Sequence, residues 1–186
     1  MKGFAADVLG IALFVTLSML ARTPVYEQCY ICLGYFVMAV WFWWFKWYDG
    51  IIVGFFGGIL FCMIADTGLY EMCGWTAGTV VLGLVFGIAA ERIKKQEGEF
   101  ISSLPVKFRR RKHAEFMPAR ILSAAAAVFI GIGVVKSLVD SFAVSQPFSV
   151  CLYKNLPVIL IDVYLLIKGT ELGQPVEEPV KRRRNR

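Results

Sequence analysis

Residues 119–142 read "ARILSAAAAVFIGIGVVKSLVDSF", an apolar stretch that follows a basic loop at residues 91–118. At about 1.5 Å of rise per residue, a helix of this length crosses the roughly 30 Å hydrocarbon core of a bilayer. The preceding loop reads "ERIKKQEGEFISSLPVKFRRRKHAEFMP" and contains eight lysines and arginines. The stretch is therefore predicted to be a membrane-spanning helix with a basic loop at its N-terminal end.

The rest of the chain has the composition of a protein with several membrane spans. Of its 186 residues, 58% are hydrophobic and 18% are charged, whereas soluble domains have about 45–50% apolar and about 25% charged residues. The apolar residues come in six blocks, each long enough to span a bilayer. The blocks lie at about residues 4–21, 29–47, 50–66, 72–90, 119–142 and 148–167. The expected fold is an all-α membrane protein in which residues 1–170 form a bundle of six transmembrane helices.

The basic residues predict which way these helices point. Loop 91–118 and the tail at residues 171–186 are rich in lysine and arginine, and an even number of helices places both on one side, together with Lys2 and Lys46. The connections on the other side contain Arg22 as their one basic residue; they lie near residues 22–28, 67–74 and 143–149. Because short basic loops stay in the cytoplasm, both termini are expected there, the C-terminal one in a disordered tail. This topology accounts for the net charge of +6, so nucleic acid is not an expected partner.

Aromatic residues cluster near the expected cytoplasmic end of the second block. They are Trp41, Trp43, Trp44, Trp47 and Tyr48 in the segment "WFWWFKWYDG". Tryptophan and tyrosine are enriched where a membrane meets water. These five residues are therefore expected to form an interfacial belt.

Ionisable residues interrupt the last two blocks. Lys136 and Asp140 are four residues apart on one helix face, so they form either a self-neutralised pair near the interface or part of an outward-open polar cavity. Lys154 and Asn155 fall near the outer end of the last block. Asp162 lies deeper, where its short side chain is expected to be protonated or paired within the bundle.

Polar groups of both signs thus gather in the outer half of the predicted bundle, which suits a pocket that captures a small solute from outside. The predicted substrate-binding residues are Arg22, Tyr26, Trp75, Lys136, Asp140, Lys154 and Asn155. The cations would bind a carboxylate or phosphate, Asp140 an amine or hydroxyl, and the aromatic rings the face of a planar ligand.

Two glycine-rich segments carry a resemblance to a known family. They are "YDGIIVGFFGGILFCMIAD" (48–66) and "GWTAGTVVLGLVFGIAAERIKK" (74–95), followed by a basic loop and two last helices. This arrangement resembles the S components of energy-coupling factor (ECF) vitamin transporters. The resemblance implies a substrate-binding subunit of the bacterial plasma membrane, with no enzymatic activity and no cofactor. It also implies a water-soluble vitamin or micronutrient as ligand, and a transmembrane coupling subunit driven by two cytoplasmic ATPases as partner.

The same resemblance implies that the first helix docks onto the coupling subunit through two small residues four positions apart. Ala6 with Gly10 and Ala12 with Thr16 both have this spacing. Small residues let a second helix approach closely in lipid. Both pairs are therefore candidate docking residues.

Two other functions remain open from the sequence. Cys29 and Cys32 form a C-x-x-C pair that the predicted topology places outside, as it does Cys73 and Cys151. This pattern is similar to that of membrane thiol-disulfide/quinone oxidoreductases. A non-transporting membrane scaffold has a similar helical plan and would need no polar pocket. No metal ligands are predicted, because no Cys/His cluster has zinc spacing. No catalytic residues are predicted either.

Overall fold

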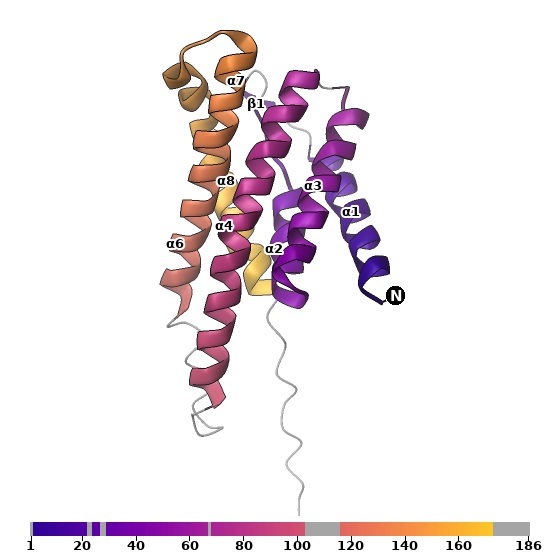
Figure 1. The fold of residues 1–186 in the computed structure, drawn as a ribbon, viewed down its shortest axis with the longest axis vertical. Coiled ribbons are helices and arrows are strands. Elements are labelled where there is room, and N and C mark those ends of the chain that lie inside the picture. The colour runs from indigo at the N-terminus through magenta and orange to yellow at the C-terminus, as the bar shows by residue number, and fades with distance from the viewer. Residues whose placement is uncertain (1, 22–23, 27–28, 67, 103–115, 173–186) are drawn as a thin grey trace, which may run out of the picture.

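The computed structural model describes residues 2–21, 24–26, 29–66, 68–102 and 116–172. Arg22, residues 103–115 of the basic loop and the tail from residue 173 lie outside the described residues. The described part is a bundle of helices with one small β-hairpin (Figure 1). The helices are α1 (Lys2–Leu20), α2 (Gly34–Trp44), α3 (Trp47–Ile64), α4 (Leu69–Ser102), α6 (Met117–Val128), η3 (Phe129–Lys136), α7 (Ser137–Val144) and α8 (Phe148–Leu172). The strands are β1 (Pro24–Tyr26) and β2 (Cys29–Tyr30).

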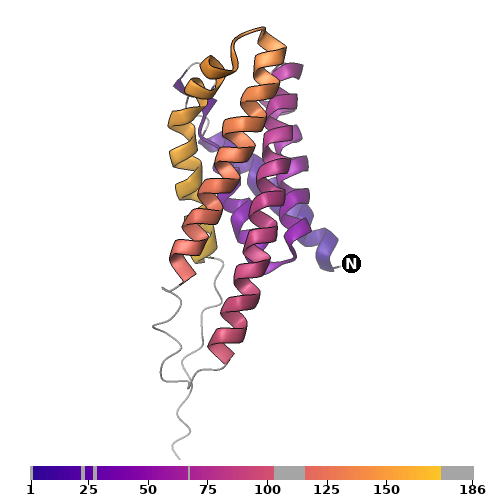
Figure 2. The ribbon, with the colours of Figure 1, turned by 60° about the vertical axis from the view of Figure 1, so that its left-hand side comes forward.

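Five of the expected spans are present as long apolar helices. They are Gly3–Leu20, Trp47–Ile64, Met72–Phe100, Met117–Val144 and Phe148–Leu172. The fourth of them joins α6, η3 and α7 into one continuous helix, which Figure 2 shows running beside α4 along its length. The chain is thus a multi-pass membrane protein.

The second expected span differs from the prediction. The predicted helix at residues 29–47 is wrong, because α2 begins only at Gly34 and has 11 residues. A helix of this length rises about 16 Å along its axis. Residues before it form the hairpin, in which Pro24 pairs with Tyr30 and Tyr26 with Cys29. At its other end, the Asp49 carboxylate accepts a hydrogen bond from the Lys46 N–H at 3.0 Å. This bond caps a new helix, so α3 begins at Trp47.

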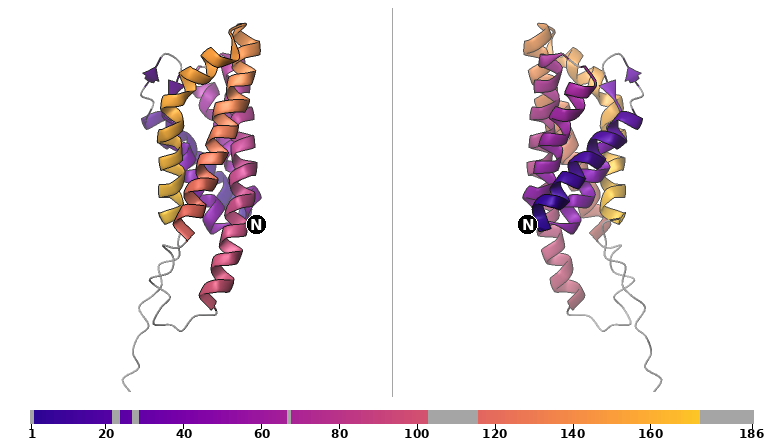
Figure 3. Two further views of the ribbon diagram at one scale, coloured as in Figure 1. Left: turned by 90° about the vertical axis from the view of Figure 1, so that its left-hand side faces the viewer. Right: turned by 90° about the vertical axis from the view of Figure 1, so that its right-hand side faces the viewer.

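Helix ends alternate between two ends of the bundle. The start of α1, the α2–α3 turn, the ends of α4 and α8 and the start of α6 lie at one end, which we call the basic end (Figures 1 and 3). The β-hairpin, the α3–α4 connection and the α7–α8 connection lie at the opposite end, which we call the hairpin end. The expected alternation of the connections is therefore present among the described residues.

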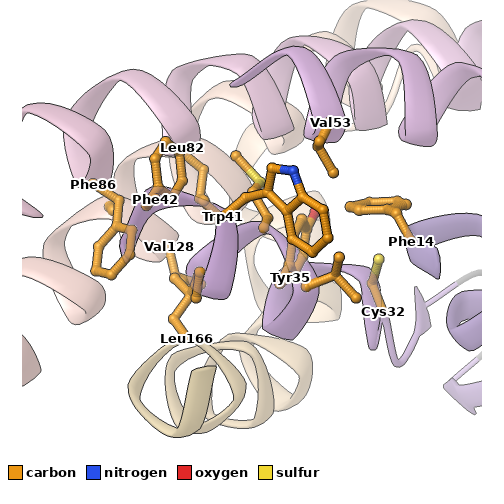
Figure 4. Packing of buried hydrophobic residues seen from close by; sticks show 14 of the residues in the cluster. Phe14, Cys32, Tyr35, Trp41, Phe42, Val53, Leu82, Phe86, Val128 and Leu166 are labelled. Atoms are coloured by element: carbon orange, nitrogen blue, oxygen red, sulfur yellow. The ribbon is translucent and has the colours of Figure 1, made fainter. Parts of the chain in front are cut away.

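Helix α2 lies in the middle of the core, because its residues are buried from Tyr35 to Trp43 except for the half-buried Phe36. Figure 4 shows Tyr35, Trp41 and Phe42 of α2 among rings and aliphatic side chains from the surrounding helices. Close packing depends on small residues facing these rings. A Cβ added at Gly34 or at Gly57 would lie 2.5 or 2.7 Å from the ring of Phe14, so both positions exclude a side chain.

The expectation that all five aromatic residues form an interfacial belt is wrong for two of them. Trp44 and Tyr48 are exposed, whereas Trp41 and Trp43 are buried in the core. The guanidinium of Arg120 lies over the Trp43 ring, 4.6 Å from its centroid, which is a cation–π contact. Trp43 is therefore a packing partner of a buried cation.

A charged cluster joins α4 to its neighbours at the basic end. Arg120 Nη2 of α6 donates to both carboxylate oxygens of Glu97 in α4, at 2.8 and 2.6 Å. Lys94 Nζ donates to the carbonyl oxygens of Phe42 and Phe45, at 2.7 and 3.2 Å. Lys94 thereby satisfies carbonyl groups that the end of α2 leaves without helical donors.

Replacing Glu97 by Gln tests the importance of this cluster for stability. Arg120 and Glu97 are 2% and 6% exposed, and breaking a buried ion pair costs about 3–5 kcal/mol. We expect E97Q to lower the Tm in detergent by several degrees. The matched control is E171Q, because the Lys168–Glu171 pair is largely exposed and such pairs contribute about 0–1 kcal/mol. Equal Tm values for E97Q and E171Q would contradict the expectation.

Candidate functional site

Four polar side chains meet in the hairpin half of the bundle, and we call them the polar cluster: Lys136, Ser137, Asp140 and Asn155. Lys136 Nζ donates to Asp140 Oδ2 at 2.5 Å and to Asn155 Oδ1 at 3.3 Å. Asn155 Nδ2 donates to Ser137 Oγ at 2.8 Å. Lys136, Ser137 and Asn155 are buried. The cluster joins the helix at 117–144 to α8 and combines cationic, anionic and neutral polar groups.

The backbone before the cluster is irregular. Residues Phe129–Lys136 form a π-helix, a rare conformation that is frequent at functional sites. Lys136 is its last residue, and Asp140 follows one turn later in α7 on the same face. The π-helix thus ends where the polar side chains begin.

Helix α4 closes one side of the cluster with two glycines. A Cβ added at Gly78 would lie 3.1 Å from Lys136 Cβ, and a Cβ added at Gly74 would collide with Asp140 Oδ1. The backbone of α4 therefore lies directly against the ion pair. Nothing in the sequence distinguishes Gly74, since a small residue in an apolar helix is most often a packing residue.

An aromatic group lies on the adjacent face of α4. The Trp75 and Tyr35 rings are stacked, with centroids 6.0 Å apart and an interplanar angle of 13°. Phe61 lies on Trp75 with a centroid distance of 5.9 Å, and the Tyr35 hydroxyl is 3.2 Å from Thr79 Oγ1. Trp75 directly follows Gly74 in the chain, so α4 connects the aromatic group with the polar cluster.

The predicted binding residues divide into three groups. Lys136, Asp140 and Asn155 come together, and Trp75 lies beside them on α4. Lys154 is half-buried and donates to Gln146 Oε1 at 3.5 Å, near the α7–α8 connection. Tyr26 is in β1 with its side chain outside the described part, as is all of Arg22. Missed by the sequence analysis were Ser137, Tyr35, Thr79 and Gly74; of these, Ser137 had a signal, since it directly follows Lys136.

Asp162 of α8 is a buried carboxylate outside the polar cluster. It lies two helical turns after Asn155 on the same face and is 1% exposed. Among the residues that the structure describes, neither of its oxygens has a hydrogen-bond partner. Cys32 and Tyr35 lie close enough to interact with it electrostatically. The pairing of Asp162 within the bundle is thus not seen in this part of the chain.

An apolar groove of about 500 Å³ lies between α3 and α4. Phe55 and Ile59 line it from α3, and residues between Met72 and Val81 line it from α4. Neither Gly74 nor Gly78 is among its lining residues. The groove is therefore on a different face of α4 from the polar cluster.

The cysteines that the structure describes show no redox pair. Cys32, Cys73 and Cys151 are free thiols, and Cys32 is buried with its sulfur 3.5 Å from Ser18 Oγ. The side chain of Cys29 lies outside the described part. No observation here supports a thiol-disulfide reaction.

The two candidate docking pairs differ in their surroundings. Gly10 is buried, and a Cβ added there would lie 2.6 Å from Trp41 and 2.7 Å from Val53. Ala12 and Thr16 are exposed. Gly10 therefore packs within the bundle, whereas Ala12 and Thr16 lie on the outer surface of α1.

The chain was compared with known protein families. The model of the family "ECF-type riboflavin transporter, S component" matches residues 2–174. This match confirms the resemblance to ECF S components that the glycine-rich segments indicated. Neither a curated protein nor a solved structure matches the chain.

Thiol labelling tests the placement of the cysteines. Cys73 is exposed, whereas Cys32, Cys62 and Cys151 are buried. We expect single-cysteine variants that retain Cys73 to react with a small maleimide in the folded state. Those that retain one of the buried cysteines should react only after denaturation, as followed by mass spectrometry. Rapid labelling of folded protein at Cys32 would show that its burial is wrong.

Proposed function

Because the chain belongs to the ECF-type riboflavin transporter S component family, we propose that it binds riboflavin from outside and delivers it through an ATP-driven coupling module. As a member of that family it is a substrate-binding transporter subunit and not an enzyme. The observation that carries the choice of ligand is the buried polar cluster beside a stacked aromatic group. Both lie in the hairpin half, joined by α4.

The chemistry of riboflavin fits these two groups. The vitamin has a planar heterocyclic ring with carbonyl and N–H groups on one edge, and an uncharged chain of hydroxyl groups. The Trp75 and Tyr35 rings are stacked on each other, and we propose that the ligand ring takes the place of one of them in this stack. Lys136 and Asn155 donate hydrogen bonds, and Asp140 and Ser137 accept them. We assign the ring to the aromatic group and the hydroxyl chain to the polar cluster.

Three further residues complete the proposed entrance. Lys154 lies near the α7–α8 connection at the hairpin end. In the sequence, Arg22 precedes the β-hairpin, and Tyr26 is the last residue of β1. We propose that these three residues contact the ligand as it enters from the hairpin end.

The proposed topology has six crossings with both termini in the cytoplasm of a bacterial cell. The second crossing consists of the short α2 together with the non-helical residues before it. Non-helical backbone is tolerated at membrane depth where protein surrounds it, and Cys32 is fully buried. The basic end carries Lys94, Arg120 and the start of loop 91–118, so the positive-inside rule places it in the cytoplasm.

Helix α1 is the proposed contact with the coupling subunit. In the span Gly3–Leu20, 17% of the residues are buried inside the bundle, which is the smallest share among the five long helices. Gly10 is already used inside the bundle, which favours Ala12 and Thr16, rather than Ala6 and Gly10, as the small residues at the contact. The two ATPases of the coupling module would supply the energy for release of riboflavin inside.

Riboflavin binding by the purified chain tests the proposed ligand. We expect flavin fluorescence to be quenched on binding, and K136A to weaken binding at least about tenfold, since one lost hydrogen bond to a charged group is worth about 1.5–3 kcal/mol. K154A should also weaken binding, with expression unchanged. The control is K95A, because Lys95 is exposed on α4 beyond Lys94. Absence of riboflavin binding by the unmodified chain would overturn the proposed function, and normal binding by K136A would overturn the proposed site.

A bulky residue on the outer surface of α1 tests the docking contact. We expect A12W to reduce co-purification of the chain with its coupling subunit, because tryptophan prevents the close approach of a second helix. L160W is the matched control, since Leu160 is exposed on α8. Both variants should bind riboflavin normally. Equal losses of the complex in A12W and L160W would rule out a specific contact through α1.

A further inference from the structure

We infer that Asp140, held in place by Gly74, makes the site select uncharged flavins and reject their phosphate esters. This inference rests on the proposed function and deepens it by assigning the residues that set ligand charge. It concerns the ion pair within the polar cluster and the glycine of α4 that adjoins it.

The first step is that Asp140 neutralises the buried lysine. Lys136 Nζ and Asp140 Oδ2 are 2.5 Å apart, with side chains 9% and 19% exposed. The pair contributes hydrogen-bonding groups of both kinds but little net charge. Neutral carbonyl and hydroxyl groups can bind to it without separating the two charges.

A phosphate ester meets a different situation. A phosphate group carries about −1.5 to −2 charges at neutral pH, and it would lie close to the Asp140 carboxylate. Charge interactions are strong where water is excluded. Because Asp140 already offsets the positive charge of Lys136, this repulsion has no free cation to compensate it within the polar cluster.

The second step is that Gly74 keeps the carboxylate in this position. Asp140 Oδ1 occupies the space that a Cβ at residue 74 would need, so Asp140 lies between Lys136 and the backbone of α4. A carboxylate at the end of a short side chain can rotate away from an added methyl group. Alanine at position 74 would therefore move the carboxylate from Lys136 while leaving both charged residues present.

Lys154 does not account for the expected selectivity. Its amino group lies 3.5 Å from Gln146 Oε1, and neither substitution changes it. Its attraction for a phosphate is thus the same in the native chain and the variants. This contribution therefore cancels when the affinity ratio of a variant is compared with that of the native chain.

The experiment measures Kd for riboflavin and for riboflavin 5′-phosphate with the full chain in detergent, by quenching of flavin fluorescence. The variants are D140N, which removes the charge and keeps the size, and G74A, which displaces the carboxylate. We expect the native chain to prefer riboflavin, and both variants to reduce that preference about tenfold or more, because Lys136 becomes available to the phosphate. The matched control is G98A, since a Cβ at Gly98 would meet nothing within 4 Å; its ratio should equal that of the native chain.

The possible results separate the two proposals. A native chain that binds riboflavin, with an unchanged ratio in D140N, overturns the selectivity role of Asp140 and leaves the proposed function intact. A changed ratio in D140N but not in G74A supports Asp140 and overturns the positioning role of Gly74. Loss of folding in G74A would also overturn the positioning role of Gly74 as stated. The role of Asp140 is then still decided by D140N. A native chain that binds neither flavin overturns both proposals.

Discussion

The close approach of α4 to the helix at 117–144 is the constraint on which the polar cluster depends. A Cβ at Gly131 would lie 2.5 Å from the Gly78 carbonyl oxygen, and a Cβ at Gly78 would lie 2.9 Å from the Gly131 carbonyl oxygen. The two backbones therefore touch where neither carries a side chain. In lipid, helix association depends on such packing because hydrocarbon offers no hydrophobic driving force. This contact brings the α4 backbone against Lys136 and Asp140.

Among the described residues, the Arg120–Glu97 and Lys136–Asp140 ion pairs have different consequences. Arg120 and Glu97 come from different helices, and Arg120 also lies over Trp43, so this pair fixes α6 against α4 and α2. Lys136 and Asp140 come from one continuous helix, so their pair does not itself join two helices. The link to α8 is made by the neutral Asn155. Exchanging the neutral Asn155–Ser137 contact for a ligand contact costs less than separating a buried ion pair, which suits the proposed binding site.

The irregular backbone lies at or near the proposed binding region. The β-hairpin replaces the first part of the expected second span, and the π-helix ends at Lys136. Non-helical backbone such as the hairpin is costly in lipid unless protein surrounds it. Cys32 and Tyr35, which follow the hairpin, are fully buried, and so is the polar end of the π-helix. Cys32 just before α2 and Lys136 at the end of the π-helix are therefore both shielded from solvent in the half where a ligand is proposed to enter.

The sequence by itself determined the membrane class, five of the long helices, the alternation of their ends and the pairing of Lys136 with Asp140. These features depend on local properties, because transfer free energies add along a segment and residues four apart share a helix face. The resemblance to ECF S components also came from local glycine spacing. Only the tertiary structure decided that α2 is short and central, that Trp41 and Trp43 are buried, that Gly10 faces inward, and that Gly74 adjoins Asp140. Hydropathy is the same for a residue that faces lipid and one that faces another helix, so the packing of neighbouring helices had to decide these positions.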